Sequence, residues 1–101
     1  MAKRARTERR DAARAAEKLA RARMKLALLA PGGAPDRPIV VMSASVVEPH
    51  ARSLPCPACS ASGVGLEEHA AAEGLRVARV RCARCGVRRE IWFRIDTTLP
   101  S

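Results

Sequence analysis

The sequence predicts a small α+β protein in which one basic α-helix precedes a small β domain. Three observations support this fold class. The first 30 residues are dominated by strong helix formers and carry most of the positive charge. All four cysteines lie in the second half of the chain, in two C-x2-C pairs. The stretch that follows the second pair alternates apolar and polar residues, which is typical of a strand. Together they predict a metal-bound β domain behind a helix.

The composition limits how much hydrophobic core this chain can form. With 101 residues, it has room for one compact domain and a tail. Hydrophobic residues make up 48%, but many are alanine, and aromatic residues make up only 2%. Small domains with so little large apolar surface need a disulfide, a metal or a partner. We expect four segments: a basic helical arm at 1–30, a linker with one or two short strands at 31–51, the metal-binding domain at 52–96, and a tail at 97–101.

The predicted helix runs from about Thr7 to Ala30 and ends at Pro31-Gly32-Gly33. Apolar residues recur in steps of three and four, which places them on one stripe of the helix. They are Ala12, Ala15, Leu19, Ala22, Leu26 and Leu29. Because the stripe gains leucines toward its C-terminal end, we expect the last turns to dock and the first turns to project into solvent.

The linker begins with a loop rich in glycine and proline. It then contains two runs of β-branched residues, Ile39-Val40-Val41-Met42 and Val46-Val47. These runs predict one short strand or two, with no pairing partner identified.

The cysteines form the most specific motif of the sequence. Cys56-Pro-Ala-Cys59 and Cys82-Ala-Arg-Cys85-Gly86 are separated by 22 residues, a spacing typical of zinc sites. Two residues between ligands allow a tight turn to aim both sulfurs at one ion, while backbone N–H groups stabilise the thiolates. Two such turns supply the tetrahedral four-thiolate shell that Zn²⁺ prefers. The predicted metal ligands are Cys56, Cys59, Cys82 and Cys85.

Other interpretations of the four cysteines stay open. A redox pair needs one C-x2-C motif in a βαβ setting, which is not found here. Two disulfides would suit an exported protein, and iron in a rubredoxin-like site uses the same ligands. His50 or His69 could replace a cysteine as a ligand.

The two cysteine turns and the strand after the second turn resemble the zinc-ribbon superfamily. Its members include domains of transcription elongation factors, RNA-polymerase subunits and ribosomal proteins. The resemblance covers less than half of the chain and implies a three-stranded antiparallel sheet. Its first two strands would be Val64–His69 and Leu75–Cys82, with a helical turn interrupting the hairpin near LEEHAAAEG. Glu67-Glu68 does not match the Asp-Glu pair of the RNA-cleaving ribbons, so that activity is not expected.

The last strand is expected at Val87 to Ile95. By the period of two, Ile91, Phe93 and Ile95 share one face, and Glu90, Trp92 and Arg94 share the other. The first face should pack on the hairpin. Trp92 could be covered by the leucines of the helix, could form an exposed stacking platform, or could make a dimer contact.

The net charge of +9 favours a polyanionic partner, with nucleic acid first. Residues 1–25 hold ten Lys or Arg residues against three acids, so the basic character belongs to the arm. A solvated helix face is the alternative. The arginines near the second cysteine pair either neutralise the thiolates or contact phosphate. The candidate nucleic-acid-binding residues are Lys3, Arg4, Arg6, Arg9, Arg10, Arg84, Arg88, Arg89 and Trp92.

These observations predict a non-catalytic, zinc-binding module that contacts DNA, RNA or a ribonucleoprotein. The alternative is a structural module that binds a protein or a second copy of this chain. No Ser/His/Asp set or phosphate loop is found, and four cysteines leave no open metal position for a substrate. We therefore expect no catalytic residues and no small-molecule substrate. No stretch is long enough to span a membrane, and we expect a cytoplasmic protein with no membrane contact.

Overall fold

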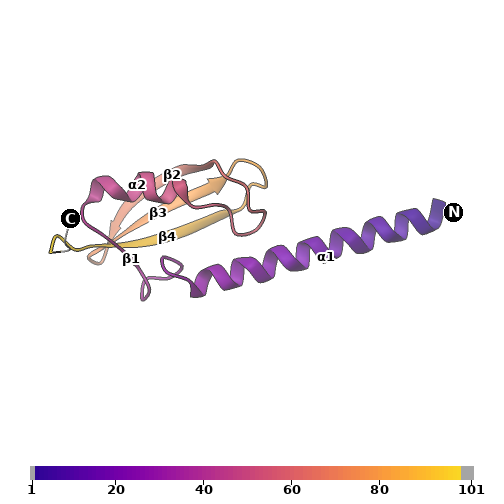
Figure 1. The fold of residues 1–101 in the computed structure, drawn as a ribbon, viewed down its shortest axis with the longest axis horizontal. Helices are drawn as coiled ribbons and strands as arrows, with labels where there is room; N and C mark the ends of the chain where they lie inside the picture. The colour runs from indigo at the N-terminus through magenta and orange to yellow at the C-terminus, as the bar shows by residue number, and fades with distance from the viewer. Residues whose placement is uncertain (1, 99–101) are drawn as a thin grey trace.

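Helix α1 (Ala2–Leu29) projects away from the rest of the protein (Figure 1). The computed structural model describes residues 2–98, without the side chains of residues 2 and 3. Its dimensions are 65 × 24 × 22 Å and its radius of gyration is 17.1 Å, against about 13 Å for a compact domain of 100 residues. The predicted helix is confirmed, although it begins several residues before Thr7.

The last turns of α1, which were expected to dock, contact no other helix or strand of residues 2–98. Within residues 2–98, no Cα atom of α1 lies within 8 Å of another helix or strand. Leu19, Leu26 and Leu29 remain 51%, 66% and 66% exposed. Trp92 is therefore not covered by these leucines, because the helix leads away from the sheet instead of folding back over it.

The turn at Gly32 and Gly33 connects the end of α1 to the sheet. A Cβ atom on Gly33 would lie 2.1 Å from the carbonyl oxygen of Ala27, so only glycine allows this close approach. Gly32 has a positive φ of 86°, and its carbonyl oxygen accepts a hydrogen bond from the backbone N–H of Trp92 at 2.8 Å. The Arg37 guanidinium donates to the Leu28 carbonyl at 3.1 Å. These contacts hold the end of the helix at a defined place on the domain.

The sheet has four strands, in the order β1-β4-β3-β2. They are β1 (Ile39–Val41), β2 (Val64–Ala72), β3 (Leu75–Cys82) and β4 (Arg88–Ile95). The prediction of three antiparallel strands is wrong, because β1 adds to the edge of β4 in the parallel direction. The antiparallel pairs β2–β3 and β3–β4 are present as expected. The first run of the linker thus forms a strand, and its partner is the last strand of the chain.

The hairpin between β2 and β3 contains no helical turn, contrary to the expectation from helix propensity. Glu73 and Gly74 both have positive φ values, of 50° and 81°, as in the two-residue turns that match the twist of paired strands. The pairing shifts by one residue between Leu66 and Glu68, which indicates a β-bulge. Pairing with β3 outweighs the strong helix propensity of the alanines in β2.

The second run of the linker forms a helix and not the expected strand. Helix α2 (Ala44–Ser53) lies over one face of the sheet (Figure 1) and contacts β2 and β3. Val47 and Ala51 are four residues apart, so they share a helix face, and both are buried. This packing overrides the β-branched residues and Pro49, which locally disfavour a helix.

The core lies between α2 and the sheet. Phe93 is 0% exposed and Ile91 is 2% exposed, and both belong to one face of β4. The expectation that this face packs on the hairpin is wrong, because β3 of the hairpin lies beside β4 in the sheet and α2 covers the face. The His50 ring meets the Phe93 ring edge to face, with 5.6 Å between centroids. Cys56 and Cys82 also belong to this buried cluster, so the core continues up to the cysteine turns.

Candidate metal centre

The four cysteine sulfurs converge at one end of the sheet, as predicted. All four Sγ atoms lie within 4.8 Å of one another. The sulfurs of Cys56 and Cys85 are 3.6 Å apart, as are those of Cys59 and Cys82. A tetrahedral shell with metal–sulfur bonds of ~2.3 Å places its sulfurs roughly 3.8 Å apart, whereas a disulfide requires about 2.05 Å. All four thiols are free, and the cluster is positioned to bind a metal ion.

The two turns that carry the cysteines share one hydrogen-bond pattern. In the first turn, the N–H of Ser60 donates to the Cys56 carbonyl at 2.7 Å. In the second, the N–H of Gly86 donates to the Cys82 carbonyl at 3.0 Å. Ser60 and Gly86 both have positive φ, of 64° and 78°. The residue that follows each pair of cysteines thus has a left-handed backbone, and each C-x2-C motif closes into a turn that aims two sulfurs the same way.

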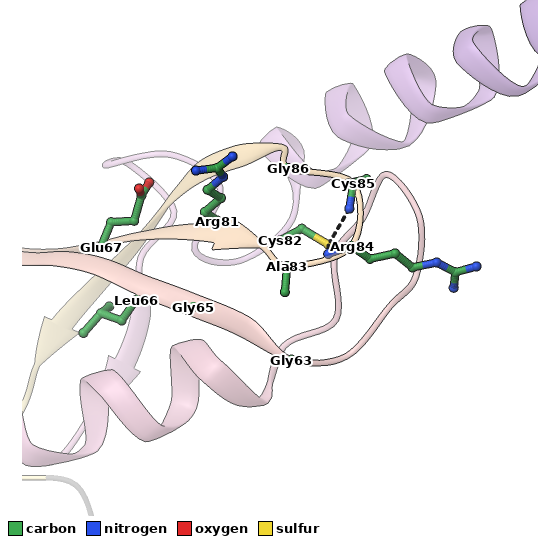
Figure 2. A pocket seen from close by; sticks show the side chains of 10 residues that line it. All are labelled: Gly63, Gly65, Leu66, Glu67, Arg81, Cys82, Ala83, Arg84, Cys85 and Gly86. Atoms are coloured by element: carbon green, nitrogen blue, oxygen red, sulfur yellow. Dashed lines mark hydrogen bonds between the residues drawn. The ribbon is translucent and has the colours of Figure 1, made fainter.

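Backbone N–H groups also point at a sulfur, as the sequence led us to expect. The N–H groups of Arg84 and Cys85 approach Cys82 Sγ at 3.4 and 3.5 Å (Figure 2). The N–H of Cys85, helped by that of Arg84, lowers the pKa of the Cys82 thiol to about 6 although burial opposes the shift. This sulfur is therefore prepared to act as a thiolate ligand.

Cys85 shows why the cluster needs a cation. The N–H of Val87 by itself would lower the pKa of Cys85, but burial and hydrogen bonds with the three neighbouring thiols raise it to about 12. One thiolate thus suppresses ionisation of the next. A divalent ion removes this conflict, because it is attracted to all four thiolates at once.

Neither histidine belongs to the cysteine cluster. His50 packs on Phe93. Nδ1 of His69 lies 3.1 Å from a carboxylate oxygen of Glu48, which links β2 to α2. Both side chains therefore contribute to the packing between α2 and the sheet.

The arginines around the second turn have different surroundings, which the sequence did not distinguish. The Nε atom of Arg89 is buried without a hydrogen-bond partner, in a site lined by Cys56 and Cys82. Burial lowers the pKa of Arg89, and the charge of the Cys56 thiolate opposes this shift. Arg88 is exposed and pairs with Glu67 at 3.0 Å. Arg84 is exposed and forms no ion pair with any described residue.

We expect replacement of Arg89 by methionine to weaken metal affinity about 10-fold, because the buried guanidinium offsets the negative charge of the thiolates. Arg89→Lys should retain most of the affinity. Competition with a chromophoric chelator measures the change, with the exposed Arg94→Met as the control. Equal affinities for Arg89→Met and Arg94→Met would contradict this role.

The other candidate residues for nucleic-acid binding are spread over the molecule. Arg4, Arg6, Arg9 and Arg10 are exposed on α1. The side chain of Lys3 lies outside the described part of the chain. Trp92 is half-buried on the face of the sheet opposite α2, beside its cross-strand neighbour Val77. The structure brings only Arg84, Arg88 and Arg89 to the same end of the domain.

Sequence reasoning missed the arrangement of the cations along α1. Five of them recur in steps of four, four, three and four residues, which keeps them within about 80° of the helix circumference. We call this set the basic stripe: Arg10, Arg14, Lys18, Arg21 and Lys25. All five are exposed, and among the residues that the structure describes, Arg21 is the one member that forms an ion pair, with Glu17 at 3.5 Å. A helical plot of the positive residues would have revealed it.

Comparisons with known proteins do not identify a family for this chain. No family model, curated protein or solved structure matches it. Among the helices described, none has the length and apolar character required to cross a membrane.

Proposed function

We propose that this protein is a non-catalytic zinc-ribbon module that binds nucleic acid through α1. The observation that carries this proposal is the basic stripe on a helix that projects freely from the domain. Phosphate groups are the binding partners that a row of unburied guanidinium and ammonium groups favours. Free thiols suit the cytosol, where they remain reduced.

Zinc is the metal that we propose for the cysteine cluster. A closed shell of four thiolates is typical of structural Zn²⁺ and leaves no position for a substrate. The cluster lies next to the core, so the ion would hold the two turns and the sheet together. Elemental analysis of protein purified from cells should give one zinc per chain; a coloured iron preparation would contradict the assignment.

The stripe has dimensions that suit a nucleic-acid backbone. Its five cations span 16 residues of helix, from Arg10 to Lys25, which places the first and the last about 22 Å apart. Contacts of this kind are made with phosphates and not with base edges, so we propose binding with little sequence preference. Binding should weaken steeply as salt displaces these contacts.

The test is a fluorescence anisotropy titration of labelled duplex DNA and duplex RNA at 50–200 mM salt. The variant R10Q/R14Q/K18Q/R21Q/K25Q keeps helix propensity while it removes the stripe. If all five cations contact DNA phosphates, the salt slope should fall by about 4.5, at about 0.9 per phosphate. We expect affinity at the lowest salt to fall at least 100-fold.

A double variant of the β domain, R52Q/R94Q, is the control for a general loss of charge. Both arginines are exposed and lie outside α1 and the cysteine turns. This control should retain most of the salt slope. Failure of the wild-type protein to bind either duplex at 50 mM salt would refute the proposal, and so would an unchanged slope in the five-site variant.

A second candidate function is supported by the exposed leucines of α1. Leu19, Leu26 and Leu29 form an apolar stripe that no described residue of another helix or strand covers. A protein partner could bury it. In a parallel pair of two α1 helices, Lys18 of one copy would face Arg23 of the other, so like charges disfavour a second copy. Sedimentation of the zinc-loaded protein tests this point: a monomer would leave a different protein as the partner of the stripe, whereas a dimer dissociated by L26Q/L29Q would show that the stripe binds a second copy.

A further inference from the structure

An open hollow of about 600 Å³ lies between the start of β2 and the second cysteine turn (Figure 2). Its walls include Gly63 and Gly65 on one side and Ala83, Cys85 and Gly86 on the other. Arg81 and Arg84 also border it, and Figure 2 shows the Arg84 side chain extending outward from the second turn. The hollow thus lies at the end of the domain that carries the cysteine turns, which we call the metal end, next to the exposed Cys85.

The glycines keep the floor of this hollow free of side chains. A Cβ atom on Gly63 would meet nothing within 4 Å. A Cβ atom on Gly65 would lie 3.9 Å from the carbonyl oxygen of Arg81. A Cβ atom on Gly86 would lie 3.9 Å from a guanidinium nitrogen of Arg81. Space is therefore available beside the main chain, and a ligand atom can approach it closely.

Arg81 and Arg84 are not engaged by carboxylates. Among the described residues, neither forms an ion pair, whereas Arg79 lies between Glu68 and Glu90. Glu67 is the one acidic residue of the wall, and Arg88 pairs with it at 3.0 Å. The hollow is therefore bordered by two arginines that have no carboxylate partner among the described residues, and by a carboxylate whose charge is already balanced. A single guanidinium group can donate two parallel hydrogen bonds to the oxygens of one phosphate.

We infer that this hollow binds a backbone phosphate of the nucleic acid that α1 contacts. This inference rests on the proposed function and adds a second contact site to it. Figure 1 shows that α1 extends toward the same side as the end of β3, where Cys82 begins the second turn. The turn at Gly32 and Gly33 preserves this arrangement. One extended polyanion can thus lie along α1 and reach the metal end of the domain.

Two variants of the full-length, zinc-loaded protein test this inference. R81Q/R84Q removes the two guanidinium groups, and the salt slope for duplex DNA should fall by about 1 to 2 relative to wild type. Gly65→Leu places a side chain in the hollow without changing the charge. Gly65 is the cross-strand partner of Arg81, and its Cβ position is unobstructed. We expect this variant to weaken binding several-fold, which a purely long-range effect of charge would not produce.

The outcomes separate this inference from the function on which it rests. R52Q/R94Q removes the same charge elsewhere, so an equal slope for it and R81Q/R84Q would overturn the phosphate site. The inference would also fail if R81Q/R84Q only weakened zinc affinity, since the arginines would then serve the thiolates. In both cases, the effect of the five-site α1 variant would remain. Absence of salt-dependent binding by the wild-type protein would instead refute the proposed function itself.

Discussion

Replacement of Cys82 by serine is expected to unfold the β domain and to leave α1 helical. Cys82 is the last residue of β3 and belongs to the buried core cluster. Its sulfur accepts hydrogen bonds from two backbone N–H groups. Metal binding in zinc-finger peptides is worth ~10–16 kcal/mol, which equals or exceeds the total stability of about 5–15 kcal/mol of ordinary domains. The hydrophobic core next to the cysteine turns is small, so we expect that its contacts do not keep the sheet folded without the ion.

Helix α1 should survive because it makes no packing contact with the sheet. Circular dichroism should therefore show a retained helical signal near 222 nm together with loss of the near-ultraviolet signal of Trp92. Chelation of the metal from wild-type protein should give the same spectra. Acidification should favour release, because the ligands must be deprotonated to bind.

Ala83→Ser is the matched control, since it adds a hydroxyl group to an exposed position of the same turn without touching a ligand. It should bind one metal ion and keep the Trp92 signal. A folded β domain in the chelated wild-type protein would contradict the prediction, because the sheet would then be stable through its core alone.

The cysteine cluster could be predicted because its geometry is local. Two residues between the ligands fix each turn, and the pattern of Cys56 and Cys59 repeats at Cys82 and Cys85. The buried face of β4 could be predicted for a similar reason, since alternation alone places Ile91 and Phe93 on one side. Helix α1 follows from composition, because its strong helix formers need no tertiary partner to favour the helix.

The remaining fold depends on contacts between distant parts of the chain. β1 pairs with β4 through residues such as Ile39 and Phe93, which are 54 positions apart. No local pattern specifies such a pair. The sequence around α2 even favours the wrong structure, because Val46 and Val47 are β-branched and Pro49 lacks an N–H group. The helix is stabilised by the sheet beneath Val47 and Ala51, which exists only in the folded domain.

The arginines illustrate the same limit at the level of side chains. In sequence, Arg81, Arg84, Arg88 and Arg89 form one cluster around the second turn. In the fold, contacts with residues distant in the sequence separate their roles: Arg88 pairs with Glu67, while Arg89 turns inward beside Cys56. Which guanidinium remains free for a ligand is decided by these contacts and not by the spacing of the arginines.

Replacement of Phe93 by alanine is expected to lower the free energy of unfolding by about 3–5 kcal/mol, even with the metal bound. Phe93 is fully buried, lies beside Ile39 of β1, and contacts the His50 ring of α2. Its removal leaves a cavity where β4, β1 and α2 meet, away from the cysteine turns. Urea denaturation of the zinc-loaded protein, followed by Trp92 fluorescence, measures the loss.

Trp92→Ala is the control on the opposite face of the same strand, and its urea denaturation is followed by circular dichroism. Trp92 is only half-buried, so its truncation should cost less than half as much. Equal losses for both variants would show that α2 does not seal the core at Phe93. A large loss confined to Phe93→Ala, with metal affinity unchanged, would show that the metal closes one end of the sheet while α2 and Phe93 close the other.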